Sequence, residues 1–142
     1  YCQALSQTYA QVKPNTLWEA LSPEENRPAK RPYADRYVKP DFVGWSGIGP
    51  IAMLIENVIG IDLNAPARRV DWTIRLIGRH GIENLALGQL GRISLICDGR
   101  TSATAEARIT ATTESPVTLR LTCAGRQKNV SLVPGSPMRV SI

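Results

Sequence analysis

The sequence predicts an α+β fold in which a helical portion, residues 1–61, precedes an antiparallel β portion, residues 62–142. Three observations lead to this prediction. Apolar residues recur at helical spacing before residue 61, they alternate every second position from Arg68 onward, and turn-forming residues separate the alternating runs. With 142 residues and 43% hydrophobic content, the chain can bury the core of one ordinary domain or of two small units packed together.

Two segments of the first portion have the spacing of helices. In residues 1–12, "YCQALSQTYAQV", apolar side chains recur at helical intervals, and Pro14 ends the segment. In residues 50–60, Pro50 suits the first helical position and Gly60 suits the C-terminal stop. One face of this second segment is an apolar stripe made of Ile51, Leu54, Ile55, Val58 and Ile59.

A proline-rich stretch separates the two predicted helices. It contains Pro23, Pro28, Pro32 and Pro40, which is too many for a helix. Such long loops are uncommon within compact domains, and when ordered they are often functional.

The β portion is a series of short runs with alternating apolar and polar residues. In "VDWTIRL" the side chains of Val70, Trp72 and Ile74 share one face of the predicted strand. The pattern continues in "RISLIC", "ARITAT", "VTLRLTC", "NVSLV" and "MRVSI", with turn signals such as "DGRTS" and "PGSP" between the runs. We therefore expect about six or seven strands in an antiparallel sheet or small sandwich.

Composition argues against several classes of function. The net charge is +5, but the basic residues are scattered and lack the interleaved aromatics of a single-strand nucleic-acid site, so we expect no nucleic-acid partner. No apolar run reaches 18 residues, and we expect no membrane span. The single histidine, His80, and three cysteines without metal-like spacing predict no metal and no cofactor. Cys97 and Cys123 fit core positions, and their pairing stays open.

The segment around Ser46 superficially resembles a hydrolase nucleophile elbow. In Gly44-Trp45-Ser46-Gly47, however, the second glycine comes one residue too early for the Gly-x-Ser-x-Gly pattern. We therefore interpret Ser46 or Gly47 as a capping residue near the start of the second helix.

Two clusters combine an aromatic residue with polar ones. The first contains Trp18 and Glu19, and the second contains Asp41, Trp45 and Ser46. Sugar sites use flat aromatic faces against the ring and carboxylates to hold hydroxyls or activate water. On pattern alone, a solvated Glu19 and a core role for Trp45 are equally compatible with the sequence.

A family resemblance favours the sugar site. "TLWEALSPE" and "KPDFVGWSGIGPIAMLIENVIGI" resemble the C-terminal end of the catalytic domain in six-hairpin (α/α)6-barrel glycoside hydrolases, which include trehalase-like, glucosidase-like and mannosylglycerate-hydrolase-like enzymes. The resemblance implies that residues 1–61 are the terminal helices of the barrel. It also implies that residues 62–142 are a β domain that follows the barrel, because "VDWTIRLIGRHGIENLALG" is similar to such an appendage.

The resemblance further implies an inverting mechanism on α-glycosides, such as trehalose-like or glycosylglycerate-like substrates. The family's general base is a Glu in a Trp/Tyr-Glu-x-x-x-Pro motif, and Glu19 matches that position. Trp18, Trp45, Ser46 and Asp41 are then the expected substrate-binding residues. An inverting pair of carboxyls stands roughly 6.5–9.5 Å apart, which leaves room for the attacking water.

The chain departs from the family in two ways. Its general acid, an Asp, would lie upstream of Tyr1, and Ala20 and Leu21 follow the glutamate where the family has polar or aromatic residues. Because the sequence begins with Tyr1, we expect a piece of a longer enzyme that is inactive alone. Its expected partner is the rest of the barrel, joined covalently or present as a separate chain. The alternative is a non-catalytic carbohydrate-binding or interaction β module.

Overall fold

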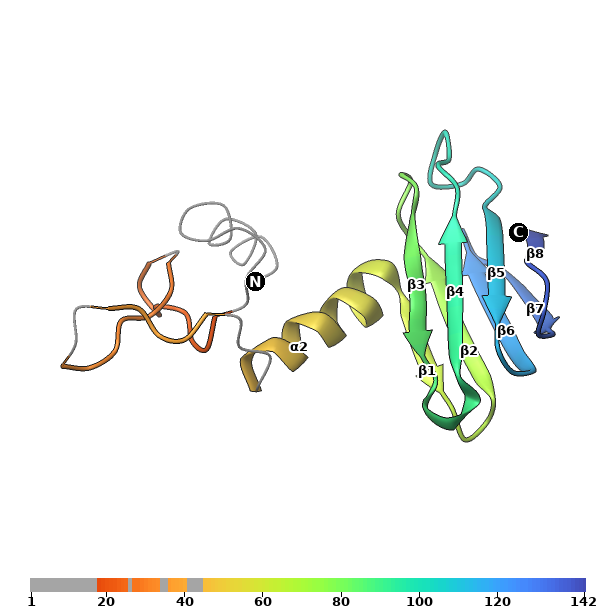
Figure 1. Cartoon of the computed structure of the whole chain (residues 1–142). Coiled ribbons are helices and arrows are strands. Elements are labelled where there is room, and N and C mark those ends of the chain that lie inside the picture. Colours follow the sequence, from red (N-terminus) through yellow and green to blue (C-terminus); the bar gives the residue numbers. More distant parts are fainter. Residues whose placement is uncertain (1–17, 26, 34–35, 41–44) are drawn as a thin grey trace. The chain divides into compact units, whose positions relative to one another are not determined.

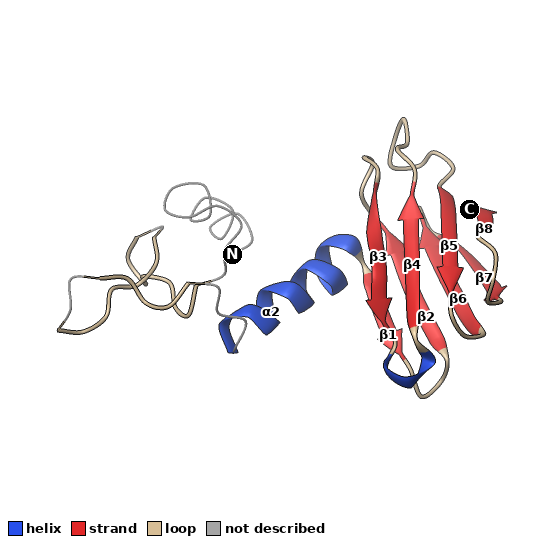
Figure 2. Cartoon of the chain, in the orientation of Figure 1, coloured by secondary structure: helices blue, strands red, loops and turns tan. Residues whose placement is uncertain are grey.

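A computed structural model describes residues 18–25, 27–33, 36–40 and 45–142 (Figure 1). The chain divides into two compact units, Tyr1–Leu54 and Ile55–Ile142. β-Strands dominate the second unit, and loops dominate the described part of the first (Figure 2).

The described loops of the first unit are held together by isolated pairs of residues and not by regular strands. Trp18 pairs with Pro40, Leu21 with Pro28, and Lys30 with Tyr37, each in antiparallel orientation. Proline cannot donate a backbone hydrogen bond and cannot continue a ladder of such bonds, so the pairs stay isolated. The loops are followed by α2, Trp45–Met53.

A π-helical segment, Leu54–Ile59, leads into the second unit's first strand. The N–H of Gly60 bonds the carbonyl of Ile55 at 2.9 Å, the five-residue spacing that defines this conformation. Gly60 ends the segment with a φ of 90°, as the sequence predicts, because this region favours glycine. Ile55 and Ile59 pack against the core of the strands that follow.

Eight strands form two four-stranded sheets in the second unit. They are β1 (Ile61–Asn64), β2 (Arg69–Ile74), β3 (His80–Ala86), β4 (Arg92–Cys97), β5 (Arg108–Thr113), β6 (Val117–Cys123), β7 (Arg126–Leu132) and β8 (Met138–Ser141). One sheet has the order β1-β2-β6-β7 and the other β3-β4-β5-β8. The pair β2–β6 is parallel, and the remaining pairs are antiparallel.

The core lies between the two sheets and receives every second residue from their central strands. From one sheet come Val70, Trp72, Ile74, Leu119 and Leu121, and from the other Ile93, Leu95, Ile109, Ala111 and Val140. Cys97 and Cys123 are buried in this core as free thiols. The indole N–H of Trp72 also donates to the carbonyl of Ile59 at 3.0 Å, which ties the π-helical segment to the sandwich.

The structure overturns the predicted fold class. Among the described residues up to 61, α2 is a single nine-residue α-helix, and no set of barrel-terminating helices is present. The predicted helix over residues 1–12 lies outside the described residues. The second helix begins at Trp45, five residues before Pro50, and turns into the π-helical segment before Gly60. The predicted apolar stripe is divided, because Ile51 is exposed whereas Ile55 is partly buried.

The predicted strands coincide with β2 and with β4 to β8, whereas β1 and β3 did not stand out from the sequence. The expectation of a purely antiparallel β portion was also wrong, because β2 and β6 run parallel. These two strands are far apart in the chain, and period-two alternation carries no information about the direction in which a strand's neighbour runs.

Candidate functional site

The first candidate site is the cluster around Trp18 in the proline-rich loops. The Trp18 side chain is 8% exposed, and its ring meets the ring of Tyr37 edge to face, with centroids 5.9 Å apart. The isolated pairing with Pro40 holds this part of the backbone in place. The buried indole Nε1 of Trp18 has no hydrogen-bond partner within the described residues. This donor is therefore available to an acceptor on a bound molecule.

Glu19 extends from the same short segment. Its carboxylate accepts the backbone N–H of Lys39 at 3.2 Å and lies 3.9 Å from the guanidinium of Arg31. Its own backbone N–H donates to the carbonyl of Lys39 at 2.9 Å. About a third of the carboxylate side chain remains exposed. Glu19 is thus positioned by a loop twenty residues away and still reaches solvent, as a proton-accepting carboxylate must.

The structure brings together only part of the predicted site. Trp18 and Glu19 are neighbours in one cluster, and Tyr37, which the sequence did not single out, completes it. Asp41 lies outside the described residues. Trp45 and Ser46 are the first two residues of α2, and their side chains also lie outside the described part of the structure.

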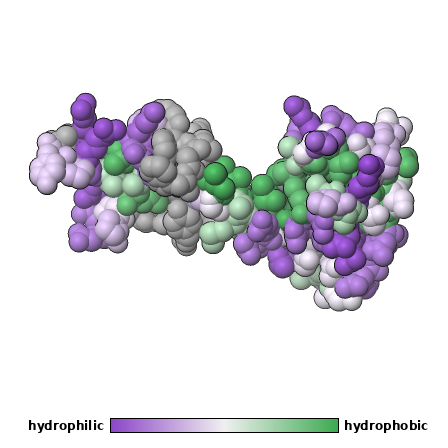
Figure 3. Space-filling model, turned by 90° about the horizontal axis from the view of Figure 1, so that it is seen from below, coloured by the Kyte–Doolittle hydropathy of each residue, from purple (hydrophilic) through white to green (hydrophobic). Residues whose placement is uncertain are grey.

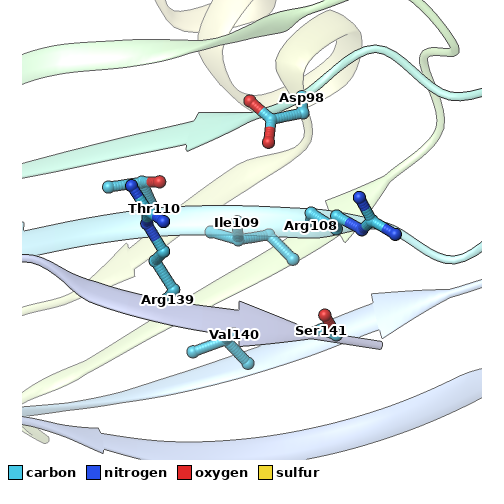
Figure 4. Close-up of a pocket in the computed structure, with 7 residues that line it drawn as sticks. All are labelled: Asp98, Arg108, Ile109, Thr110, Arg139, Val140 and Ser141. Carbon is cyan, nitrogen blue, oxygen red and sulfur yellow. The ribbon is translucent and has the colours of Figure 1, made fainter.

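The second candidate site is a polar pocket of about 430 Å³ on the sandwich. Asp98, Arg108, Ile109, Thr110, Arg139, Val140 and Ser141 line it (Figure 4). Ile109 and Val140 are buried in the core, so their neighbours along β5 and β8 face outward. The pocket therefore lies on the outer face of the β3-β4-β5-β8 sheet.

A smaller pocket of about 300 Å³ adjoins the first one and shares Asp98 and Arg108 with it. It is formed by the loop between β4 and β5, which Arg100 fastens to the rest of the sandwich. The Arg100 guanidinium donates to the carbonyl of Leu76 at 2.8 Å and contacts Sγ of Cys123 at 3.0 Å. The loop beneath both pockets is therefore fixed by charge-assisted hydrogen bonds.

Sequence reasoning missed this pocket because its residues are spread from position 98 to position 141. Each belongs to a strand or loop whose polar residues were interpreted as ordinary solvent-facing positions. The alternation of β5 and β8 correctly places Arg108, Thr110, Arg139 and Ser141 on outward faces, but only the pairing of the two strands brings them together.

His80 and Cys97, two further side chains that could carry chemistry, make contacts that serve the packing of the sandwich. His80 meets the edge of the Trp72 ring, with centroids 5.8 Å apart, and its Nδ1 lies 2.7 Å from the carbonyl oxygen of Gly78. Burial raises the pKa of the Cys97 thiol, which makes its reactive thiolate scarce.

The described residues contain no group of three or more potential metal ligands. They also include no helix that is long and apolar enough to cross a membrane.

Comparison with known proteins gives one distant relative. No protein family and no solved structure matches the chain. An uncharacterized protein of Borreliella burgdorferi is 30% identical over 86 residues, which cover 58% of this chain. The same match spans 17% of the relative's length. The likeness thus concerns a small part of a much longer protein.

Proposed function

We propose that the chain is the C-terminal portion of an inverting glycoside hydrolase that acts on α-glycosides, with Glu19 as its general base. The observation that supports this proposal best is the cluster itself. A part-exposed carboxylate stands beside a buried tryptophan that pairs with Tyr37 and whose indole N–H has no partner among the described residues. Hydrolysis of a sugar acetal uses a pair of carboxyl groups, and this cluster would supply one of them beside aromatic side chains that suit the face of a sugar ring. The motif resemblance around Glu19 adds to this support.

In the proposed reaction, the Glu19 carboxylate takes a proton from the water that attacks the anomeric carbon. A carboxylic acid from another segment protonates the departing oxygen. The contacts with Lys39 N–H and Arg31 orient the Glu19 carboxylate before the substrate arrives. Asp41, Trp45 and Ser46 remain proposed substrate-binding residues, with trehalose-like or glycosylglycerate-like compounds as substrates.

The proposed partner is the remaining segment of the same enzyme. Two features support it. Ile48 and Ile51 of α2 are 65% and 43% exposed, and the helix appears largely hydrophobic in Figure 3. An exposed apolar face of this kind is usually covered by another part of a protein. The relative is also much longer than the part of it that this chain matches.

The test is glycoside hydrolysis by the full-length protein with Glu19→Gln. We expect kcat to fall by about 10²–10⁴-fold, because the amide cannot accept the proton of the attacking water. Glu24→Gln is the matched control, since Glu24 is an exposed carboxylate of the same loop and its activity should stay near that of the unaltered protein. Turnover of trehalose and glucosylglycerate by the Glu19→Gln protein at the original rate would remove Glu19 from the mechanism.

A second candidate function is a non-catalytic carbohydrate-binding or interaction module. The polar pocket on the sandwich favours it, because this pocket belongs entirely to the unit Ile55–Ile142 and does not involve Glu19. If this candidate is correct, ligand binding depends on the pocket residues, and Glu19→Gln leaves it unchanged.

A further inference from the structure

We propose that the outer face of the β3-β4-β5-β8 sheet carries a binding site for a sugar acid, a saccharide unit with a carboxylate beside its hydroxyl groups. The site is the 430 Å³ pocket lined by Asp98, Arg108, Thr110, Arg139 and Ser141. It rests on the second candidate function, a carbohydrate-binding module, for which it names the ligand class, and it stands whether or not Glu19 is catalytic.

The strand register builds the polar surface of the pocket. Arg108 on β5 lies directly opposite Ser141 on β8, and Thr110 lies directly opposite Arg139. Directly opposed side chains on one face of an antiparallel pair are about 4.5–5.5 Å apart at Cβ. The face of this strand pair therefore carries two guanidinium groups and two hydroxyls, and Figure 4 shows the Arg139 guanidinium beside Thr110 and the Arg108 guanidinium directed toward the other end of the pocket. Figure 4 shows Asp98 and Ser141 on opposite sides of the β5 strand that carries Arg108 and Thr110.

Within the described residues, the two arginines of this patch have few ionic partners. Arg139 is exposed and forms no ion pair with any described residue. Arg108 has a 3.4 Å ion pair with Glu106, but both side chains are more than half exposed, and such pairs contribute little stability. A guanidinium offers two parallel N–H donors that match a carboxylate, so Arg139 is suited to hold the acid group of a ligand.

The outer face of the opposite sheet provides an internal comparison. There Arg69 and Arg120 both point at Asp71, with N–O distances of 2.9 and 3.4 Å. That sheet neutralises its arginines with a carboxylate from its own strand β2. On the β5–β8 face the residue directly opposite Arg139 is Thr110 and not a carboxylate, and the one carboxylate that lines the pocket, Asp98, forms no ion pair with Arg139. The anion that this arginine would hold is therefore expected from a ligand.

Asp98 narrows the class of ligand. Its carboxylate lines the same pocket and follows β4 at the rim of the sheet. A carboxylate accepts hydrogen bonds from sugar hydroxyls and repels anions, and the repulsion is stronger for a phosphate or sulfate with up to two negative charges than for a ligand with a single carboxylate. A sugar acid carries both groups that this pocket would bind: hydroxyls that donate to Asp98 and a carboxylate that accepts from Arg139. No aromatic side chain lines the pocket, and the one Trp, Tyr or Phe of the sandwich strands, Trp72, is buried, so recognition relies on hydrogen bonds and not on stacking.

The experiment measures binding of glucuronate, glucose and inorganic phosphate to the full-length protein by isothermal titration calorimetry. We expect glucuronate to bind at least about tenfold more tightly than either of the other probes, because only glucuronate satisfies both Arg139 and Asp98. Arg139→Ala should weaken glucuronate binding by about tenfold or more. Arg92→Ala is the matched control, since Arg92 is also an exposed arginine of this sheet but does not line the pocket.

Two further variants make the outcome decisive. Asp98→Asn should raise the affinity for phosphate relative to that for glucuronate, because it removes a repulsion that is stronger for a doubly charged anion and replaces the carboxylate acceptor of the glucuronate hydroxyls with a weaker amide oxygen. Glu19→Gln should leave glucuronate binding unchanged, which separates this site from the proposed catalytic one. The proposal is overturned if glucuronate does not bind, if phosphate binds equally well, or if Arg92→Ala weakens binding as much as Arg139→Ala.

Discussion

The two described and buried tryptophans, Trp18 and Trp72, belong to regions that are stabilised in different ways. Trp72 is 1% exposed within the core of an eight-stranded sandwich, and its indole N–H bonds the carbonyl of Ile59. Trp18 is 8% exposed among proline-rich loops, and its indole N–H has no described partner. The difference indicates that Trp72 is placed for stability, whereas Trp18 retains a donor that a bound molecule can use.

The largest expected effect is that of Trp72→Ala. Removing this ring from the core leaves a cavity between the sheets, and we expect the free energy of unfolding of the sandwich to fall by about 3–5 kcal/mol. Urea denaturation followed by circular dichroism measures this change. Trp18→Ala should affect the sandwich transition far less, because Trp18 belongs to the other compact unit. Equal losses from both variants would show that the two units unfold as one.

The next largest effect is expected at Gly60, where the π-helical segment joins β1. A Cβ atom at this position would collide with the backbone carbonyl of Thr73, and the φ of 90° is unfavourable for other residues. We expect Gly60→Ala to lower the free energy of unfolding by about 2–3 kcal/mol. Gly125 has a φ of 78° with open space around it, so Gly125→Ala should cost only about 1 kcal/mol. If the two variants lose the same stability, the steric contact at Gly60 is not important.

Replacement of each tryptophan by phenylalanine tests the difference between the two indole donors. Trp72→Phe removes the hydrogen bond to Ile59, and we expect a loss of about 1–3 kcal/mol from the unpaired carbonyl and the smaller ring. Trp18→Phe removes a donor that has no described acceptor, so its cost comes from the smaller ring alone and should be smaller than that of Trp72→Phe. If the proposed hydrolytic function is correct, Trp18→Phe in the full-length protein should raise KM, because the variant lacks the donor for the substrate. A large loss of stability in the Trp18→Phe protein would instead indicate that the indole N–H of Trp18 forms a hydrogen bond that stabilises the fold.

The smallest effect concerns the pH dependence of the sandwich. Burial raises the pKa of the Cys97 thiol, so the folded state keeps its proton at a pH where the unfolded state loses it. The resulting stabilisation is complete below the ordinary thiol pKa and decreases as the pH rises through the folded value. Urea unfolding at about pH 7 and about pH 10 should therefore show a loss that Cys97→Ala reduces. An identical pH dependence in this variant would exclude Cys97 as the source.

The sequence located the strands well but misjudged the region before them. Alternation in "RISLIC" and "VTLRLTC" coincides with β4 and β6 over their full lengths, because every inward side chain of a half-buried strand must be apolar. The apolar spacing of residues 50–60 indicated a helix but not a barrel. Ile51 and Ile55 share a predicted stripe, yet one is exposed and the other packs on the sandwich core. Spacing shows that a helix has an apolar face but not what covers that face.

The two candidate sites also differ in how much of each could be predicted from the sequence. Glu19 and Trp18 are adjacent in the sequence, and their chemistry was evident from the residues alone. Tyr37 and Arg31 join them only because the proline-rich loop folds back through isolated pairings. The pocket of Arg108 and Arg139 gave no local signal, since the two arginines are separated by the strands and turns of β6 and β7.

The sequence by itself determined six of the eight strand segments, β2 and β4 to β8, the residues of these strands that face the core, and the place where a carboxylate adjoins an aromatic side chain. These properties depend on local periodicity and on immediate neighbours. Only the tertiary structure decided that β2 pairs with β6 in parallel, that β5 pairs with β8, and that Arg139 therefore lies opposite Thr110 and not opposite a carboxylate. The physical reason is that pairing between distant strands is selected by the packing of the whole core, and no single segment encodes that packing.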